Sequence, residues 1–152
     1  MHHWLVKTEP DSYSIDDLAR DKVTSWDHVR NYQARNYLRQ MALGDQVMIY
    51  HSSVVPPGVV GLASVSRAAY PEAAQFDRSS RYFDPVATKE NPRWFSPDLK
   101  FQQRFGGVLE LQALKGHKEL QEMVLLKRGS RLSVQPISVE EFKIICRLAS
   151  KL

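Results

Sequence analysis

Two apolar segments in the first half of the chain are joined by a turn rich in proline and glycine. Residues 46–52 carry Val-Met-Ile-Tyr at their centre, and residues 59–66 are apolar around Gly61. The Pro-Pro-Gly sequence at 56–58 interrupts strand pairing and favours a tight turn. The pattern therefore predicts a β-hairpin. A glycine inside its second strand is typical of a place where a backbone or a ligand approaches closely.

The remaining elements alternate between short strands and helices. Ser14 and Ser138 each precede an apolar helical stripe with acidic residues in its first turn, which predicts two capped helix starts. Residues 98–105 alternate apolar and polar side chains with the period of a half-buried strand. The other predicted elements are a strand at 4–7, a helix at about 30–41, short helical pieces at 108–128 and a strand at 132–136.

Residues 70–97 are rich in Asp, Arg, Ser, Asn and Pro, with several aromatic residues interspersed. This composition predicts a long irregular excursion with a strand or two embedded, and long ordered loops often carry function. The mixture of elements places the chain in the α+β class, with a small curved sheet or barrel of about five or six strands flanked by helices. Without a repeat or a linker-like tract, we expect one domain spanning 1–152.

The net charge and the cysteine content limit which ligands, metal sites and cellular locations are expected. The 21 Lys and Arg against 17 Asp and Glu give a formal charge of +4, which permits moderate binding to polyanions. Cys146 is the only cysteine, so we expect no disulfide framework and no zinc site, and a reducing, cytoplasmic location fits. The amino-terminal segment lacks a long apolar region, which argues against a secretory signal or membrane span. We expect a monomer with no cofactor or metal.

The run at 25–38, SWDHVRNYQARNYL, concentrates aromatic rings, amides and guanidinium groups at the entry of a predicted helix. Such a mixture suits a flat, polar, anionic ligand such as a nucleotide. A ring stacks on a base, an amide pairs with the base edge, and an arginine neutralises a phosphate. An amphipathic helix with ordinary core aromatics has the same composition, so both interpretations stay open at this point.

Five motifs follow one another in an order that resembles the EVE domain family over essentially the whole chain. They are WLVKTEP at 4–10, SWDHVRNYQARN at 25–36, GD at 44–45, YHS at 50–52 and RLSVQP at 131–136. The resemblance implies a PUA-like fold related to ASCH and YTH domains, a role in reading modified bases, and no catalysis. His28 stands where the family usually has glycine, and Gly106-Gly107 replaces an often more rigid stretch. Both departures bear on loop shape and not on the fold.

The family motif and the positions of particular residues in the chain indicate which residues meet the base. Trp26 is expected to form one wall of an aromatic cage, with a core tryptophan as the alternative. Trp94, in the irregular segment, is the expected second wall. Asn31 is the first choice for the base edge, although an asparagine at a helix start also serves as a cap. Further edge candidates are Ser25, Gln33, Ser52 and the backbone near Tyr50.

Polar groups from the first and last strands complete the predicted site. Lys7 and Glu9 belong to the signature near the cavity, or they form a buried ion pair with each other. Residues 131, 133 and 135 share one face of the last strand, where they either line the pocket or fasten the strand. The phosphate-binding candidates are Arg30, Arg35, Arg39, Lys100, Arg104 and Arg131, with a solvated surface as the alternative.

The expected function is a non-catalytic nucleic-acid reader that holds a modified base, favoured by resemblance to be a 5-modified cytosine of DNA, or a modified base of RNA. An enzyme of nucleotide or RNA metabolism using His51, Asp27 or Glu9 remains an alternative, as does a protein-binding scaffold. His51 points to the opposite strand face from its neighbours, so a His-Ser dyad is geometrically poor and a structural histidine is favoured. The sequence shows no nucleophile elbow or phosphate-binding glycine loop.

Overall fold

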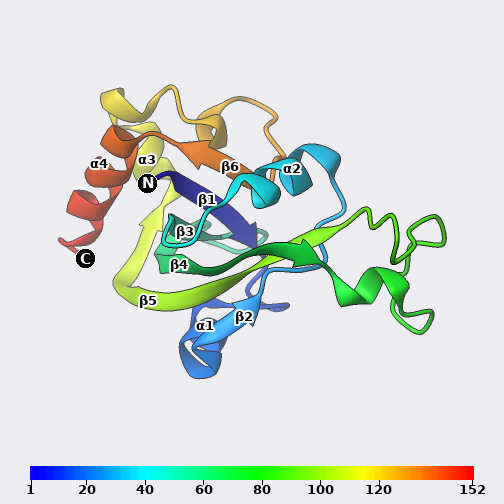
Figure 1. The fold of residues 1–152 in the computed structure, drawn as a ribbon. Helices are drawn as coiled ribbons and strands as arrows, with labels where there is room; N and C mark the ends of the chain where they lie inside the picture. Colours follow the sequence, from blue (N-terminus) through cyan, green and yellow to red (C-terminus); the bar gives the residue numbers. More distant parts are fainter.

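A six-stranded mixed β-sheet organises the computed structural model, which describes residues 1–152 (Figure 1). The strands are β1 (His3–Thr8), β2 (Val23–Ser25), β3 (Gln46–His51), β4 (Gly58–Pro71), β5 (Phe95–Glu110) and β6 (Val134–Ile137). The α-helices are α1 (Ile15–Asp21), α2 (Tyr32–Gln40), α3 (Leu111–Lys115) and α4 (Val139–Ala149), and short 3-10 helices lie at Ala73–Phe76, Lys118–Leu120 and Val124–Leu126. None of the helices is long and apolar enough to span a membrane.

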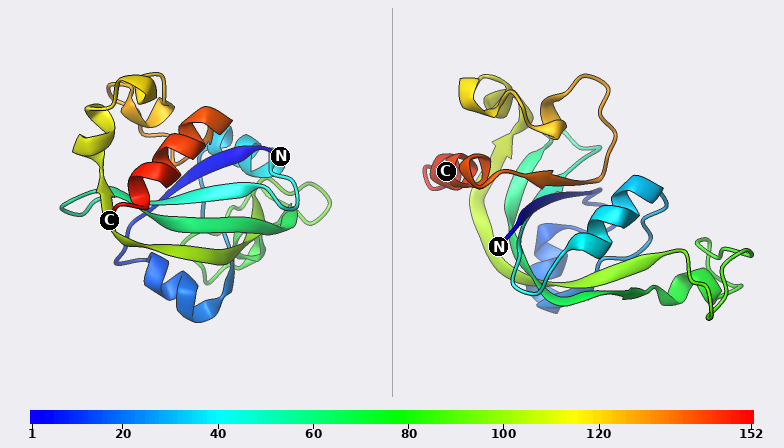
Figure 2. Two further views of the ribbon diagram at one scale, coloured as in Figure 1. Left: turned by 90° about the vertical axis from the view of Figure 1, so that its left-hand side faces the viewer. Right: turned by 45° about the horizontal axis from the view of Figure 1, so that its top comes forward.

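The strands lie in the order β2-β5-β4-β3-β1-β6, with β1 and β3 parallel and every other neighbouring pair antiparallel. The sheet is curved and open, and β2 and β6 form its edges (Figure 2). The predicted α+β class with about six strands and flanking helices is therefore confirmed. The strands do not close into a barrel, because β2 and β6 do not pair with each other.

Apolar side chains cover both faces of the central strands, because successive residues of a strand point to opposite sides. Trp4 and Val6 belong to a core with α1 and α2, whereas Leu5 belongs to a second core with α3 and α4. Figure 2 shows the two pairs of helices on opposite sides of the sheet. The sheet is therefore a buried middle layer, and the loops at its ends remain free to form a site.

Both predicted serine caps are present. The Ser14 hydroxyl accepts a hydrogen bond from the Asp17 backbone N–H at 3.1 Å, and the Asp17 carboxylate accepts one from the Ser14 N–H at 2.9 Å. Ser138 and Glu141 form the same reciprocal pair at the start of α4. Each pair satisfies backbone donors that the first turn of a helix leaves free.

The β3–β4 hairpin is confirmed, but its strands and the neighbouring β5 differ in length from the prediction. β4 continues to Pro71 and β5 begins at Phe95, so the excursion covers residues 72–94 and contains a 3-10 helix but no strand. β5 also includes residues 108–110, which were predicted to be helical. β2 was not predicted at all. These residues form strands because they pair with a long neighbouring strand, and the local sequence pattern gives no sign of that pairing.

Gly61 lies where β4 meets both β5 and α1. A Cβ atom on this glycine would collide with the carbonyl oxygen of Gln103 and lie 2.7 Å from the Cδ1 atom of Ile15. The predicted close approach is confirmed, and the approaching groups are a neighbouring strand and a helix. This contact sets α1 directly on the sheet.

His51 has the structural role favoured by the sequence. Its Nε2 atom accepts a hydrogen bond from the backbone N–H of Ile15 at 3.1 Å, at the start of α1. Burial lowers the pKa of His51, and the carboxylate of Asp16 only partly opposes this shift. The neutral imidazole is the form that can accept this hydrogen bond.

This arrangement predicts that acid weakens the fold through His51. A histidine whose pKa is lowered by folding contributes stability above its ordinary pKa of about 6.5, and that contribution is lost as the pH falls through the folded value. The free energy of unfolding, measured in urea, should therefore fall between pH 7.5 and pH 5. His51→Gln keeps an acceptor but does not titrate, so its decrease over the same range should be smaller. Equal decreases in the two proteins would contradict this role.

Candidate nucleic-acid pocket

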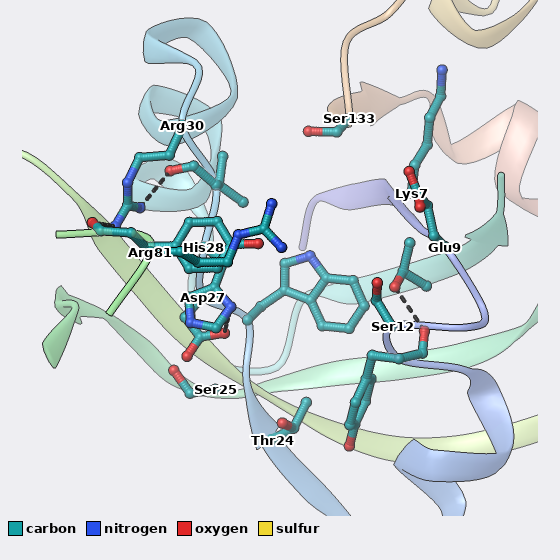
Figure 3. Close-up of a pocket in the computed structure, with 15 residues that line it drawn as sticks. Lys7, Glu9, Ser12, Thr24, Ser25, Asp27, His28, Arg30, Arg81 and Ser133 are labelled. Carbon is teal, nitrogen blue, oxygen red and sulfur yellow. Dashed lines mark hydrogen bonds and ion pairs between the residues drawn. The ribbon is translucent and has the colours of Figure 1, made fainter. Parts of the chain in front are cut away.

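A cavity of about 570 Å³ lies beside the ends of β1 and β2. Fifteen residues line it, drawn from residues 7–13, residues 24–30, the excursion residues Arg81 and Tyr82, and Ser133 before β6. Figure 3 places Lys7 and Glu9 on one side of the cavity and His28 and Arg81 on the other. Its size falls within the range of small-ligand sites and suits one nucleobase.

Trp26 is one of the aromatic residues that line the cavity. Only 7 % of it is exposed, and it belongs to the core beneath α1 and α2. Its ring meets that of Tyr13 edge-on, with centroids 6.2 Å apart. His28 and Tyr82 also line the cavity and stack on each other at 4.0 Å with an interplanar angle of 7°. Trp26 is therefore both a core tryptophan and a cavity residue, so the two predicted roles coincide.

Residues 26–31 form neither a helix nor a strand, and α2 begins at Tyr32, close to the start of the helix predicted at about 30–41. His28 has φ of 68°, in the left-handed region that favours glycine. The glycine usual in the family would suit this backbone, so the departure noted at His28 falls on a conformationally demanding position.

A buried carboxylate fixes this segment from the far end of β4. Glu72 is 2 % exposed and accepts hydrogen bonds from the backbone N–H of His28 at 2.7 Å and from Arg30 Nη1 at 2.9 Å. Arg30 Nη2 also donates to Glu72, at 2.5 Å, and to the carbonyl of Tyr82, at 2.7 Å. Glu72 therefore ties the cavity segment to the excursion. Glu72, Tyr82 and Arg81 were not among the site residues predicted from the sequence.

Asp27 supplies the cavity with a partly desolvated carboxyl group. Burial raises the pKa of Asp27, and the nearby carboxylate of Glu72 raises it further, while His28 and Arg30 oppose the shift. Its Oδ1 atom lies 3.5 Å from Nδ1 of His28. An acceptor held partly out of water binds an N–H donor more strongly than a fully hydrated one does.

Lys7 and Glu9 both line the cavity, as predicted, but they do not pair with each other. Burial lowers the pKa of Lys7, whose ammonium nitrogen lies 5.9 Å from the ring centroid of Tyr50. No carboxylate forms an ion pair with it, and Glu9 instead accepts a hydrogen bond from Ser53. The alternative of a buried Lys-Glu pair is wrong, and the ammonium group of Lys7 has no ionic partner.

The predicted second wall lies elsewhere. Trp94 is absent from the cavity lining, is 6 % exposed, and stacks on Tyr32 with centroids 5.1 Å apart. Its indole N–H donates to Asp84 at 2.8 Å, and its backbone N–H donates to the side chain of Gln75 at 2.9 Å. These bonds hold the ring outside the cavity, so Trp94 and Trp26 do not form one cage.

Asn31 also lies outside the cavity lining, five residues along an irregular segment from Trp26. Its side-chain oxygen accepts a hydrogen bond from the Ala34 N–H at 2.9 Å and caps α2, which is the alternative the sequence left open. Gln33 and Ser52 do not line the cavity, and Tyr50 is buried in the other core. Of the predicted edge candidates, Ser25 lines the cavity and donates to the Ser96 hydroxyl at 3.0 Å.

The candidate phosphate contacts are dispersed. Arg30 lines the cavity but is neutralised by Glu72, and Arg104 pairs with Asp16 beside α1. The other candidates lie outside the cavity lining: Arg35 and Arg39 on α2, Lys100 on β5, and Arg131 before β6. Residues 131, 133 and 135 were predicted to share one face of the last strand, and of these only Ser133 lines the cavity. Gln135 is buried and donates a hydrogen bond to the Leu132 carbonyl. No cluster of His, Cys, Asp and Glu is arranged to hold a metal ion.

Two solved structures and one curated relative resemble the chain over nearly its whole length. A hypothetical protein from Leishmania major has 50% sequence identity and a TM-score of 0.94, covering 99% of this chain and 96% of that one. A crystal structure of human THYN1 in complex with DNA containing 5-methylcytosine has 37% identity and a TM-score of 0.92, covering 100% and 99%. Thymocyte nuclear protein 1 of Homo sapiens is 38% identical over 98% of this chain and 74% of its own length.

The names of these relatives correct one expectation. The curated relatives from human, chicken and mouse are all called thymocyte nuclear protein 1. A nuclear protein conflicts with the cytoplasmic location predicted from the single cysteine, and that prediction is wrong. Cysteine usage reports a reducing environment, which the nucleus shares with the cytosol.

The family model described as EVE domain matches residues 2–148. The match includes the cavity segment around Trp26 and the strands that flank it. It confirms the resemblance drawn from the five sequence motifs, and the PUA-like fold expected from them agrees with the similar solved structures. The chain belongs to the EVE domain family.

Proposed function

We propose that this protein is a non-catalytic reader module that takes a 5-modified cytosine, flipped out of DNA, into the cavity beside Trp26. The observation that carries the proposal is the similarity to human THYN1, whose structure contains DNA with 5-methylcytosine. The similarity covers this chain completely at a TM-score of 0.92. A base inside a duplex is inaccessible to a pocket of this kind unless it leaves the helical stack.

The cavity lining matches the chemistry of a cytosine. Trp26 supplies a ring for stacking, which contributes about 1–3 kcal/mol per base. Cytosine presents an amino group at C4 and acceptors at N3 and O2, and a carboxylate is a suitable partner for the amino group. Asp27 provides that acceptor, and Lys7 provides donors from the opposite side of the cavity (Figure 3). We therefore assign cytosine recognition to Asp27 and Lys7.

The catalytic alternative has less support from the geometry. His51, its preferred acid or base, does not line the cavity and accepts a hydrogen bond from the Ile15 N–H. Asp27 and Glu9 do line the cavity, and reading a base requires no proton transfer from either. The proposed role is binding alone, with a modified base of RNA as the second ligand to compare.

Titration by tryptophan fluorescence tests the proposal. Matched duplexes carry cytosine, 5-methylcytosine or 5-hydroxymethylcytosine at one position, at fixed salt, with RNA versions alongside. We expect the modified DNA to bind more tightly by on the order of 10- to 200-fold, the range that one methyl group in a pocket can supply. Size-exclusion chromatography of the same samples tests the expected monomer.

Lys7→Met provides the pocket variant for this titration, because it keeps the length of the side chain and removes the ammonium group. It should weaken binding of modified DNA by about 10-fold or more, since hydrogen bonds to charged groups contribute about 1.5–3 kcal/mol. Lys100→Met, at an exposed residue of β5 outside the cavity lining, is the matched control. Equal binding of all duplexes, or equal effects of the two variants, would refute the proposal.

A further inference from the structure

Helix α2 presents arginine side chains that no acidic side chain neutralises. Between Asp27 and Asp45 the sequence contains no Asp or Glu. Arg35 and Arg39 lie one turn apart on α2, and neither forms an ion pair. Like charges at this spacing destabilise a helix, and α2 has no acidic residue to offset the repulsion between the two arginines.

Aromatic rings hold both guanidinium groups in place. The Cζ atom of Arg35 lies 4.8 Å from the ring centroid of Tyr32 and 5.9 Å from that of Trp94. The Cζ atom of Arg39 lies 4.2 Å from the ring centroid of Phe95. Arginines stacked on rings are preorganised, so less side-chain entropy is lost when they bind an anion.

The hydrogen bonds of Arg35 also leave its charge uncompensated. Its guanidinium donates to the Arg93 carbonyl at 2.9 Å and to the side-chain oxygen of Asn36, both neutral acceptors. Burial lowers the pKa of Arg35, and the charge of Arg39 lowers it further. A phosphate placed here would relieve the repulsion between the two arginines.

Trp94 links the arginines of α2 to the lining of the cavity. Arg30 lines the cavity and its Cζ atom lies 4.9 Å from the centroid of Trp94, and the same ring stacks on Tyr32 beside Arg35. Trp94 therefore connects Arg30, in the cavity lining, to α2, although Trp94 does not line the cavity itself.

We infer that the α2 arginine surface, formed by Arg35 and Arg39 on the rings of Tyr32, Trp94 and Phe95, binds the phosphodiester backbone beside the flipped base. The inference rests on the proposed function for the identity of the polymer. Arg30 and Arg104 do not belong to this surface, because Glu72 and Asp16 neutralise their charges. The contacts are to phosphates, so they do not depend on whether the base is modified.

The salt dependence of binding tests this inference. The affinity of the intact protein is measured from low to moderate salt on two duplexes that differ only in one 5-methyl group. For each phosphate contact removed, the slope of log affinity against log salt should fall in magnitude by about 0.9. Arg35→Gln and Arg39→Gln together should lower it by about 1.8 on both duplexes, and should leave the ratio of the two affinities unchanged.

Two sets of variants serve as controls. Arg104→Gln removes the same charge from an ion-paired site and should leave the slope unchanged. Replacing Arg35 and Arg39 by lysine keeps both charges and should retain most of the slope. An unchanged slope in the double glutamine variant, with thermal unfolding showing that it is folded, overturns the inference, as does a lysine variant that loses as much slope as the glutamine variant.

The unmodified duplex separates this inference from the proposed function. If the protein does not prefer the modified duplex but the slope on the unmodified one falls as stated, the reader function fails and the backbone surface stands. If the preference is present and the slope is insensitive to α2, the reader function stands and the surface is refuted. Failure to bind either duplex refutes both.

Discussion

Asp27→Asn is expected to remove most of the preference of this protein for 5-methylcytosine over thymine in otherwise identical duplexes. The two bases share the methyl group at position 5 and differ at position 4, where cytosine has an amino group and thymine a carbonyl. A carboxylate accepts from the amino group and repels the carbonyl, whereas an amide can donate to the carbonyl. A good pair of this kind contributes about 1–3 kcal/mol, so the affinity ratio should fall by on the order of 10- to 100-fold.

The same variant should fold at least as well as the parent. Burial raises the pKa of Asp27, which means that folding disfavours its ionised form, and a neutral asparagine avoids that penalty at pH 7. We therefore expect an unchanged or higher melting temperature together with weaker discrimination. Asp77→Asn, in an exposed turn of the excursion, is the matched control for binding and should leave the base preference unchanged. A full preference in Asp27→Asn would show that another group reads position 4.

Local interactions explain which parts of the fold the sequence could predict. The caps at Ser14 and Ser138 depend on partners three residues away, and the hairpin depends on one turn, so short windows of sequence contain the necessary information. β2 pairs with β5, more than 70 residues away, and its three residues carry no pattern of their own. Tertiary pairing of this kind is not visible in local propensity.

The residues of the candidate site, too, were predicted only in part. Trp26, Lys7 and Glu9 were predicted to lie at the cavity from their places in the family motifs, and the structure brings them together there. Asn31 and Trp94, also predicted for the site, lie outside the cavity lining, where Asn31 caps α2 and Trp94 donates to Asp84 and Gln75. His28 has a positive φ at the position where the family usually has glycine, so the segment before α2 follows an irregular path.

Glu72 had no local sign of its role, because it contacts a backbone 44 residues away and becomes buried only when the excursion folds back. Glu72→Gln should therefore destabilise the protein more than any other single carboxylate-to-amide change near the cavity. A buried ion pair that loses one partner costs about 3–5 kcal/mol, and the partial exposure of Arg30 reduces the expected loss to about 2–4 kcal/mol.

Glu72→Gln should lower both the free energy of unfolding and the affinity for modified DNA, because Glu72 holds the backbone of His28 next to Asp27 and Trp26. Urea unfolding of Glu72→Gln should give the lower free energy, and affinity for the modified duplex should fall even at temperatures where the variant is folded. Glu90→Gln makes the same chemical change on an exposed residue of the excursion and should leave both unchanged. A Glu72→Gln variant with parental affinity would mean that Arg30 and Tyr82 alone maintain the cavity segment.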